Sequence, residues 1–250
     1  MKMNKFLNLK TVQYFGVIAL TIFTFASCSK SDTRPGSTNG SLPPFAQVEI
    51  VHAAAGASAL DVSFDNNRLG LSFFNYTDRV DYLRAIPGNR SIKIFKAAAA
   101  NNAAPLITKD YTFDQGRHYT VFIVDTAAKM DIVSIKDSSR SAGPDSVRLR
   151  FANMSPDAPA LDLYVQGNPT PIATNISYKT AGEFFSFKSG INIVFELKKT
   201  GQSTVIATSE PTNLISSRIY TIWSGGYING NSVIGTNLKV SDFTHNPLYY

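Results

Sequence analysis

Few side chains in this sequence could carry out acid–base or nucleophilic chemistry. Such work needs a group that titrates near neutral pH, which is most often histidine, and the chain has three: His52, His118 and His245. His52 and His118 fall in alternating, strand-like segments, and His245 lies in the C-terminal tail. No histidine pair or cysteine cluster of the kind that holds zinc is present in the sequence. We therefore predict a non-enzymatic protein with no catalytic residue, no metal and no cofactor.

Acidic residues are the other candidates for chemistry. Glycosidases use two carboxylates about 5–10 Å apart, and Asp61, Asp65, Asp157 and Asp162 are available for such a pair. Asp61 and Asp162 stand out because they occupy equivalent places in an internal repeat. Each follows an apolar leucine, which favours a structural role, either on the solvent side of a strand or bonded to a neighbouring turn. A hydrolase of envelope polymers is therefore the least favoured of three functional hypotheses.

Cys28, the only cysteine, points to chemistry of a different kind. It follows a basic start and an apolar run over residues 14–26, which is the pattern of an export signal. The segment Phe25-Ala26-Ser27-Cys28 resembles the lipobox of bacterial lipoproteins, in which the cysteine sulfur takes up diacylglycerol. The resemblance implies a signal peptide over 1–27 and an outer-membrane lipoprotein of the Bacteroidota type, facing the periplasm or the cell surface. The alternative is a plain secreted protein with an unpaired thiol at this position.

The lipid on Cys28 is the expected membrane contact, because the apolar run is shorter than the roughly 20 residues that a spanning helix needs. Residues 28–44 are polar and lack apolar periodicity, so they predict a flexible tether. Removal of three lysines with the signal lowers the formal charge from +6 to +3. The remaining basic residues are scattered, as at Arg148 and Arg150, and we interpret them as solvated strand faces. We therefore expect no nucleic acid partner.

The sequence repeats itself at an offset of 101 residues. Residues 48–62 align with residues 149–163, and residues 118–122 align with residues 219–223. Because solenoid repeats run about 20–50 residues, this longer offset indicates duplicated domains. The predicted domains are 45–136 and 146–250, joined by a polar linker over 137–145.

Strand-like spacing dominates each repeat. Ile92 and Ile94, for example, share one face of their segment while Lys93 lies on the other. Seven or eight such segments in roughly 100 residues predict an all-β fold, with two tandem antiparallel β-sandwiches of the immunoglobulin-like kind. The segment 114–119 resembles a tyrosine corner, in which a buried phenol bonds to nearby backbone. The alternative is that Tyr119 is an ordinary core tyrosine.

The run over residues 151–165, followed by Tyr178, Gly190 and Tyr220-Thr221, resembles the DUF4397 domain. This is a module of unassigned function in bacterial cell-envelope proteins. The second repeat closely resembles the family, whereas the first repeat resembles it only in outline. The resemblance implies a β-sandwich outside the cytoplasm and implies no reaction.

Aromatic residues are the candidates for recognition. Trp223, the only tryptophan, shares a strand face with Thr221. If that face is exposed to solvent, Trp223 is exposed too. The alternative is that Trp223 packs between the domains. Tyr164 and Tyr227 are further ligand-binding candidates. The favoured hypothesis is an adhesive or scaffolding module that contacts a protein or a glycan. The other is an accessory subunit of an outer-membrane uptake or secretion complex.

Overall fold

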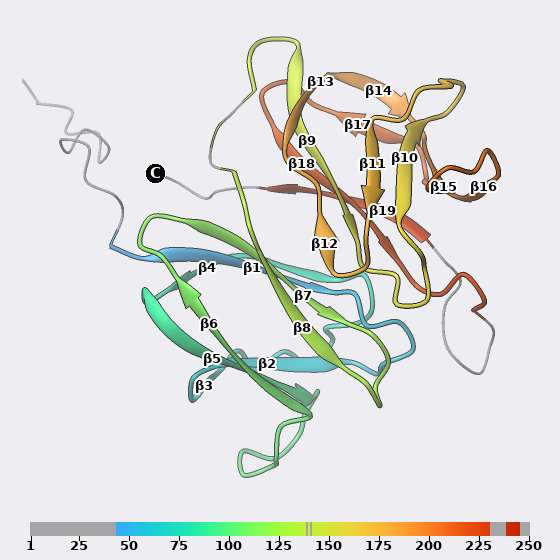
Figure 1. The fold of residues 1–250 in the computed structure, drawn as a ribbon. Helices are drawn as coiled ribbons and strands as arrows, with labels where there is room; N and C mark the ends of the chain where they lie inside the picture. Colours follow the sequence, from blue (N-terminus) through green and yellow to red (C-terminus); the bar gives the residue numbers. More distant parts are fainter. Residues whose placement is uncertain (1–43, 139, 141, 231–238, 246–250) are drawn as a thin grey trace, which may run out of the picture. The chain divides into compact units, whose positions relative to one another are not determined.

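The computed structural model describes residues 44–138, 140, 142–230 and 239–245. The predicted signal peptide, the lipid site at Cys28 and nearly all of the predicted tether lie outside these residues. The described residues form strands, turns and irregular segments with no α-helix, which confirms the all-β prediction (Figure 1). Accordingly, no helix in these ranges is long and apolar enough to cross a membrane.

Residues 46–136, here called the first half, form two four-stranded sheets. One sheet has the order β4-β1-β7-β8 and the other has the order β3-β2-β5-β6. The strands are β1 (Ala46–His52), β2 (Leu60–Phe64), β3 (Asn67–Arg68), β4 (Arg79–Ala85), β5 (Gly88–Lys96), β6 (Ile107–Phe113), β7 (His118–Val124) and β8 (Asp131–Lys136).

Residues 146–245, here called the second half, repeat this plan with additional short strands. One sheet has the order β12-β9-β18-β19, with β13 also paired to β9, and a second has the order β11-β10-β15-β16. A small third sheet pairs β14 with β17. The strands are β9 (Ser146–Asn153), β10 (Leu161–Val165), β11 (Ala173–Ile176), β12 (Thr180–Ala181), β13 (Phe185–Lys188), β14 (Gly190–Ile193), β15 (Phe195–Lys199), β16 (Val205–Thr208), β17 (Thr212–Leu214), β18 (Ile219–Gly225) and β19 (Lys239–His245).

The central pairing of each half is parallel, which differs from the fully antiparallel expectation. β1 pairs in parallel with β7, and β9 pairs in parallel with β18. Parallel neighbours need a crossover connection, and the chain supplies it by passing through the other sheet of the same half between these strands. An immunoglobulin-like topology stays a prediction.

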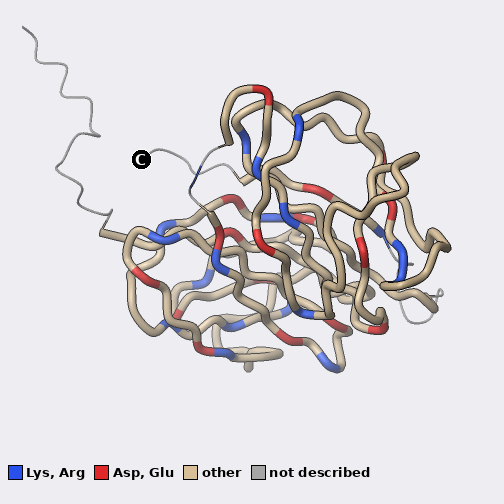
Figure 2. The backbone as a smooth tube through the Cα atoms, turned by 45° about the horizontal axis from the view of Figure 1, so that its top comes forward, with Lys and Arg blue, Asp and Glu red and all other residues tan. Residues whose placement is uncertain are grey.

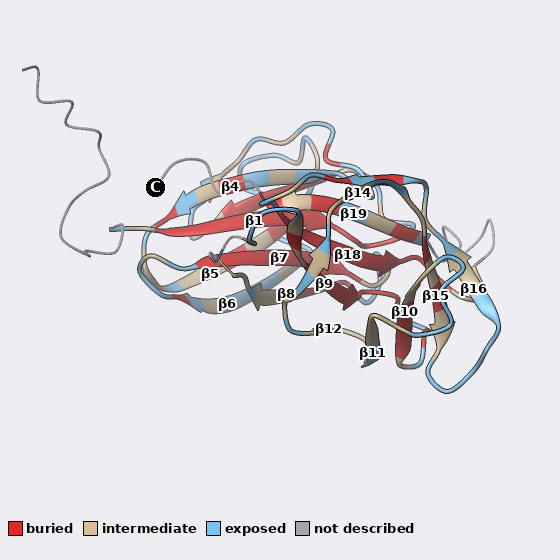
Figure 3. Ribbon diagram, turned by 90° about the horizontal axis from the view of Figure 1, so that it is seen from above, coloured by how far each residue is buried: buried red, intermediate tan, exposed pale blue. Residues whose placement is uncertain are grey.

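Each half has its own apolar core between its two sheets, and alternation explains these cores. In β5, Ile92 and Ile94 are buried and Lys93 is half-buried, as the spacing predicted. The central strands behave differently, because β1, β7 and β18 are buried at every position (Figure 3). Their second face is covered by a third apolar cluster with members from both halves.

The described residues all belong to one compact unit. Separate folding of the two predicted domains therefore stays a prediction. Acidic and basic residues are interspersed along both halves and form no long run of one sign (Figure 2).

Candidate binding groove and the buried cluster between the halves

The repeated aspartates hold the turns of the sandwiches. Asp61 Oδ1 accepts the backbone N–H of Leu71 at 2.9 Å, and Asp61 Oδ2 lies 3.3 Å from Arg68 Nε. Asp162 Oδ1 accepts the backbone N–H of Asn175 at 2.8 Å and the hydroxyl of Thr200 at 2.7 Å. Both carboxylates are buried. Their contacts are those of structural anchors bonded to a neighbouring segment.

His52 and its repeat-equivalent Asn153 make the same two turn contacts with different side chains. His52 Nδ1 accepts the N–H of Ala54 at 3.3 Å, and Asn153 Oδ1 accepts the N–H of Ser155 at 3.1 Å. On the other side, His52 Nε2 lies 3.5 Å from the carbonyl of Ser58, and Asn153 Nδ2 donates to the carbonyl of Pro159 at 3.2 Å. The imidazole thus substitutes for an amide. Burial lowers its pKa below 6.5 because the charged form loses hydration.

Tyr119 and Tyr220 also have equivalent roles. The Tyr119 hydroxyl accepts the N–H of Asp114 at 3.0 Å and donates to its carboxylate at 3.0 Å. The Tyr220 hydroxyl accepts the N–H of Ile215 at 2.9 Å. Each phenol therefore bonds back to the loop before its strand, as a tyrosine corner requires.

Trp223 is buried at the interface between the halves, with 2% of its surface exposed. Its ring lies 6.0 Å from that of Phe122, its repeat-equivalent, and 6.4 Å from that of Tyr76. The strand face that Trp223 shares with Thr221 is therefore buried. The sequence could not show this, because alternation groups residues on a face without saying what covers it.

Arg150 lies at the centre of the same interface and is 1% exposed. It donates Nε to Thr221 Oγ1 at 2.9 Å, and it donates Nη2 to Thr120 Oγ1 at 3.3 Å and to Asp137 Oδ1 at 2.5 Å. Our interpretation of Arg150 as part of a solvated face was wrong, since the opposing half covers that face. The side chain of Asp137, the first residue of the predicted linker, is fully buried in this pair.

His245 is buried at the end of β19 and takes part in the same cluster, where we expected only a tail residue. Its Nε2 lies 2.5 Å from Thr221 Oγ1, and its Nδ1 lies 2.7 Å from the Tyr82 hydroxyl and 3.3 Å from Glu49 Oε2. Burial raises the pKa of Glu49, and the neighbouring His245 opposes that rise. Burial and the nearby Asp137 likewise raise the pKa of Tyr82.

The order hydroxyl, imidazole, carboxylate is that of a nucleophile, a base and an orienting acid. Thr221, His245 and Glu49 are all buried, however, and the Thr221 hydroxyl also accepts a hydrogen bond from Arg150. None of these three residues lines the neighbouring groove, whose lining includes Arg79 and Thr244. Their arrangement therefore joins the two halves. Over the described residues, no group of histidine, cysteine and acidic side chains could hold a metal ion.

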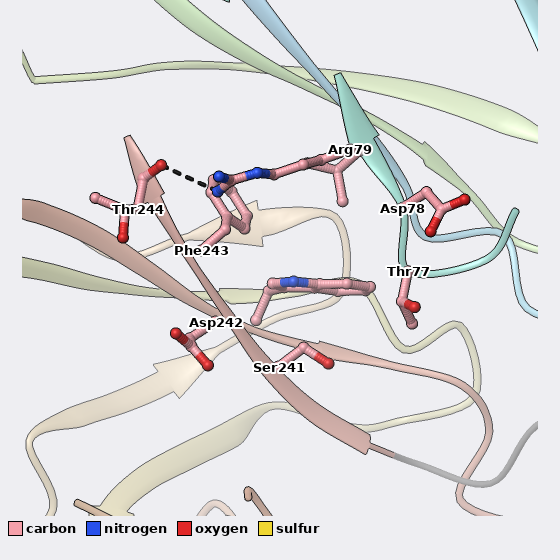
Figure 4. A pocket seen from close by; sticks show the side chains of 9 residues that line it. Thr77, Asp78, Arg79, Ser241, Asp242, Phe243 and Thr244 are labelled. Carbon is pink, nitrogen blue, oxygen red and sulfur yellow. Dashed lines mark hydrogen bonds between the residues drawn. The ribbon is translucent and has the colours of Figure 1, made fainter. Parts of the chain in front are cut away.

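An open groove of about 450 Å³ lies at the edge of this interface (Figure 4). It lies between the start of β4 and the strand β19, which are edge strands of their sheets. The lining residues are Val51, Thr77, Asp78, Arg79, Trp223, Ser241, Asp242, Phe243 and Thr244.

Arg79 connects the groove to the buried cluster. Its Nη1 donates to the carbonyl of Thr244 at 3.0 Å and lies 3.8 Å from Glu49 Oε1, and its guanidinium lies 5.8 Å from the Phe243 ring centre. Figure 4 shows this side chain reaching across from β4 toward β19. The groove wall is therefore fixed by a side chain of one half bonded to backbone of the other.

Thr77 gives the groove wall a strained backbone. Its φ is 77°, which is an outlier for a β-branched residue. Hydrogen bonds on both sides hold it, since Thr77 N–H donates to the His52 carbonyl at 2.8 Å and His52 N–H donates to the Asp78 carbonyl at 2.9 Å. Strain of this kind persists only where the surroundings impose it, and it is concentrated at functional sites.

The other two aromatic candidates do not join Trp223 in an exposed patch. Tyr164 is half-buried on β10, in the other sheet of the second half, and Lys198 Nζ lies 4.0 Å from its ring centre. Tyr227 is buried, and that burial raises its pKa to about 12.

Residues 46–164 match the family model of DUF4397, a domain of unknown function. The chain contains a DUF4397 domain. The matched region covers the whole first half, together with β9 and most of β10. The run over 151–164 lies inside the DUF4397 match, whereas Tyr178, Gly190 and Tyr220, which we also related to the family, lie beyond it.

No curated protein matches this chain. A solved structure described as "Alpha-glucan binding by a streptococcal virulence factor" is 14% identical with a TM-score of 0.23, covering 77% of this chain and 97% of that one. Another, "Crystal structure of a putative adhesin from Bacteroides ovatus", is 8% identical with a TM-score of 0.16, covering 84% of this chain and 100% of that one. TM-scores of this size carry no argument about function.

Sequence reasoning missed the groove and most of the buried cluster. The only available signal was the repeat itself, because its equivalent positions carry Glu49 in one copy and Arg150 in the other. An acidic and a basic residue at equivalent positions on the outer faces of the two repeats are compatible with packing of these faces against each other. Arg79 and Asp137 have no such signal, since the contacts that define their roles come from distant segments.

Proposed function

We propose that this protein is a non-catalytic cell-envelope lipoprotein that binds a protein or glycan partner in the groove between β4 and β19. The observation that carries the proposal is the composition of that groove. Side chains from both halves line it, including a carboxylate (Asp242), a guanidinium (Arg79) and hydroxyls such as Thr77 and Ser241. These groups offer hydrogen-bond donors and acceptors to a polar ligand.

The size and rigidity of the groove support the same proposal. Its volume of about 450 Å³ falls within the range of roughly 300–1,000 Å³ that is usual for ligand sites. The Arg79 contact to Thr244 and the strained Thr77 fix its walls before a ligand arrives. Binding to walls that are already ordered avoids much of the entropy cost of association.

Membrane attachment through diacylated Cys28 is the second part of the proposal. Each buried methylene contributes about 0.8 kcal/mol, and stable anchoring takes about two chains, so a diacylglycerol thioether would hold the protein at the outer membrane. We expect Cys28→Ala to move the protein from the membrane fraction to the soluble fraction. Retention of this variant on membranes after a high-salt wash would contradict lipid anchoring.

The groove is tested by filling it. On a Cys28→Ala background, we expect Ser241→Trp to abolish retention of the protein on purified envelope glycan or envelope protein fractions. Lys239→Trp adds the same side chain to the same strand, but Lys239 does not line the groove, so this control should bind normally. Equal retention of both variants would contradict the proposed site. Co-purification of an intact transport complex with both variants would instead support the accessory-subunit hypothesis.

A further inference from the structure

The groove continues into a longer track on the surface of the first half. A hollow of about 310 Å³ shares Asp78 and Arg79 with the groove. The next, of about 250 Å³, shares Leu71 and Ser72 with that hollow. A last one of about 300 Å³ shares Arg68 with its predecessor. Each depression therefore adjoins the next, in a row from Ser241 on β19 to Lys93 on β5.

Cations along this track already have partners. Arg79 Nε lies 3.1 Å from Asp81 Oδ1, and Arg68 Nε lies 3.3 Å from Asp61 Oδ2. Lys93 Nζ donates to Asn66 Oδ1 at 3.1 Å. Because no basic side chain of the track lacks a partner, the walls offer polar groups without a strong field of one sign. Such walls favour a neutral, polar ligand over an anionic polymer.

An aromatic ring stands in the middle of the track. Phe73 lines the second hollow and is 85% exposed, which is more than any other large apolar side chain among the described residues. Its backbone neighbour Phe74 is buried in the core and anchors the loop. An aromatic face held in solvent between hydrogen-bonding groups suits the apolar face of a sugar ring.

Beyond the groove, the walls of the track are ordered by side chains instead of by a strand edge. Arg68 Nη1 donates to the carbonyls of Ala99 at 2.9 Å and Ala100 at 3.1 Å, and its guanidinium lies 3.9 Å from the Phe95 ring centre. Residues 69–78 and 97–105 around the track belong mainly to loops. An added peptide strand needs a continuous row of edge N–H and C=O groups, and these loops do not supply one.

We propose that the ligand is a neutral, linear glycan that lies along this track, with one sugar ring stacked on Phe73. The inference rests on the proposed function, because the groove forms one end of the track. Several sugar rings would be held at once, so affinity should rise with chain length until the track is filled.

The test uses the Cys28→Ala protein and an array of neutral linear oligosaccharides of graded length, with a polyuronate as the anionic probe. We expect calorimetry to show affinity increasing with length for at least one neutral series. Phe73→Ala should weaken the longest member roughly tenfold, the loss of an aromatic contact worth about 1.4 kcal/mol. Ile191→Ala removes another exposed apolar side chain, in the second half and away from the track, and should have no effect.

The outcomes separate this inference from the proposed function. If Ser241→Trp abolishes envelope binding while Phe73→Ala changes nothing, the ligand is confined to the groove and the track is refuted. Tighter binding of the polyuronate, or no binding of any neutral series, also refutes it. If Ser241→Trp itself has no effect, the proposed function fails as well.

Discussion

The two halves use equivalent residues in the same way inside each sandwich and in different ways where the halves meet. The inner contacts are matched, as Asp61 with Asp162 and Tyr119 with Tyr220 show. At the interface the equivalent positions have diverged. Glu49 in the first half corresponds to Arg150 in the second, and both are buried between them.

The equivalent positions at the interface differ in size as well as in charge. Phe122 and Val124 of β7 correspond to Trp223 and Gly225 of β18. A larger ring is therefore accompanied by a smaller neighbour two residues along the same face. The comparison teaches that duplication preserved what folds each sandwich, whereas packing the copies together required their outer faces to differ.

The strongest test of this comparison removes Arg150. We expect Arg150→Met to lower the free energy of unfolding by about 3–5 kcal/mol, because it removes the guanidinium that pairs with the buried carboxylate of Asp137. Arg150→Met together with Asp137→Leu should recover much of the loss. Arg148→Met is the control, since Arg148 lies two residues along the same strand and is only half-buried. Chemical denaturation measures all three variants, and equal losses at Arg148 and Arg150 would contradict the special role of the interface.

The matched turn anchors should respond alike. We expect Asp61→Ala and Asp162→Ala each to cost about 1.5–3 kcal/mol, because buried donors lose a charged acceptor. The loss should be larger at Asp61, where Arg68 also loses its carboxylate partner. Asp81→Ala removes an exposed carboxylate and should cost about 0–1 kcal/mol. Thermal melts that show one anchor to be dispensable would break the equivalence of the halves.

Gly225 should tolerate no larger side chain while Trp223 is present. A Cβ at this position would lie 2.5 Å from Trp223 Cζ3 and 2.8 Å from the Tyr76 hydroxyl. We expect Gly225→Ala to destabilise by about 1–3 kcal/mol through overpacking, and Trp223→Phe, which restores the ring of the first half, to relieve part of that cost. In Gly143→Ala, the control, the new Cβ would meet its nearest atom at 3.8 Å. Additive effects in the double variant would argue against the size compensation.

The exchange of histidine for asparagine should have the smallest effect, and the effect should depend on pH. Burial lowers the pKa of His52 below 6.5, so the unfolded chain binds the extra proton. The stability that neutral His52 contributes is therefore present above about pH 6.5, and it is lost as the pH falls from there through the lowered pKa of the folded state. We expect His52→Asn to keep the turn contacts seen at Asn153 and to flatten the fall in stability between about pH 7 and pH 5.

The raised pKa of Glu49 acts in the opposite direction, because the folded state then binds more protons. The difference between His52→Asn and the parent protein, measured by denaturation at each pH, cancels that contribution. A pH profile unchanged by His52→Asn would show that His52 does not titrate differently on folding.

Much of the fold could be predicted from local patterns. Alternation at residues such as Ile92 and Ile94 indicated strands, and the offset of 101 residues related the two halves. The structural role expected for Asp61 and Asp162 agrees with their hydrogen bonds to neighbouring segments. The parallel pairing of β1 with β7 could not be predicted, because the direction of a pairing depends on how the intervening strands divide between sheets.

The groove was beyond sequence reasoning for a related reason. Thr77 and Asp242 are far apart in the chain and line one depression only because β4 and β19 are both edge strands at the interface. The sequence left Trp223 open to recognition or to packing between the domains, and the structure shows that the opposing half buries it.

By itself, the sequence determined that the described chain is built from strands, that its pattern is duplicated and that particular acids follow particular leucines. These properties depend on residue spacing over a few positions, which backbone geometry translates directly into faces and turns. Only the tertiary structure decided that the outer faces are dry, that Arg150 is buried with Asp137, and that a groove opens beside them. A strand fixes which side chains share a face, but what covers that face depends on surfaces brought together from the other half of the chain.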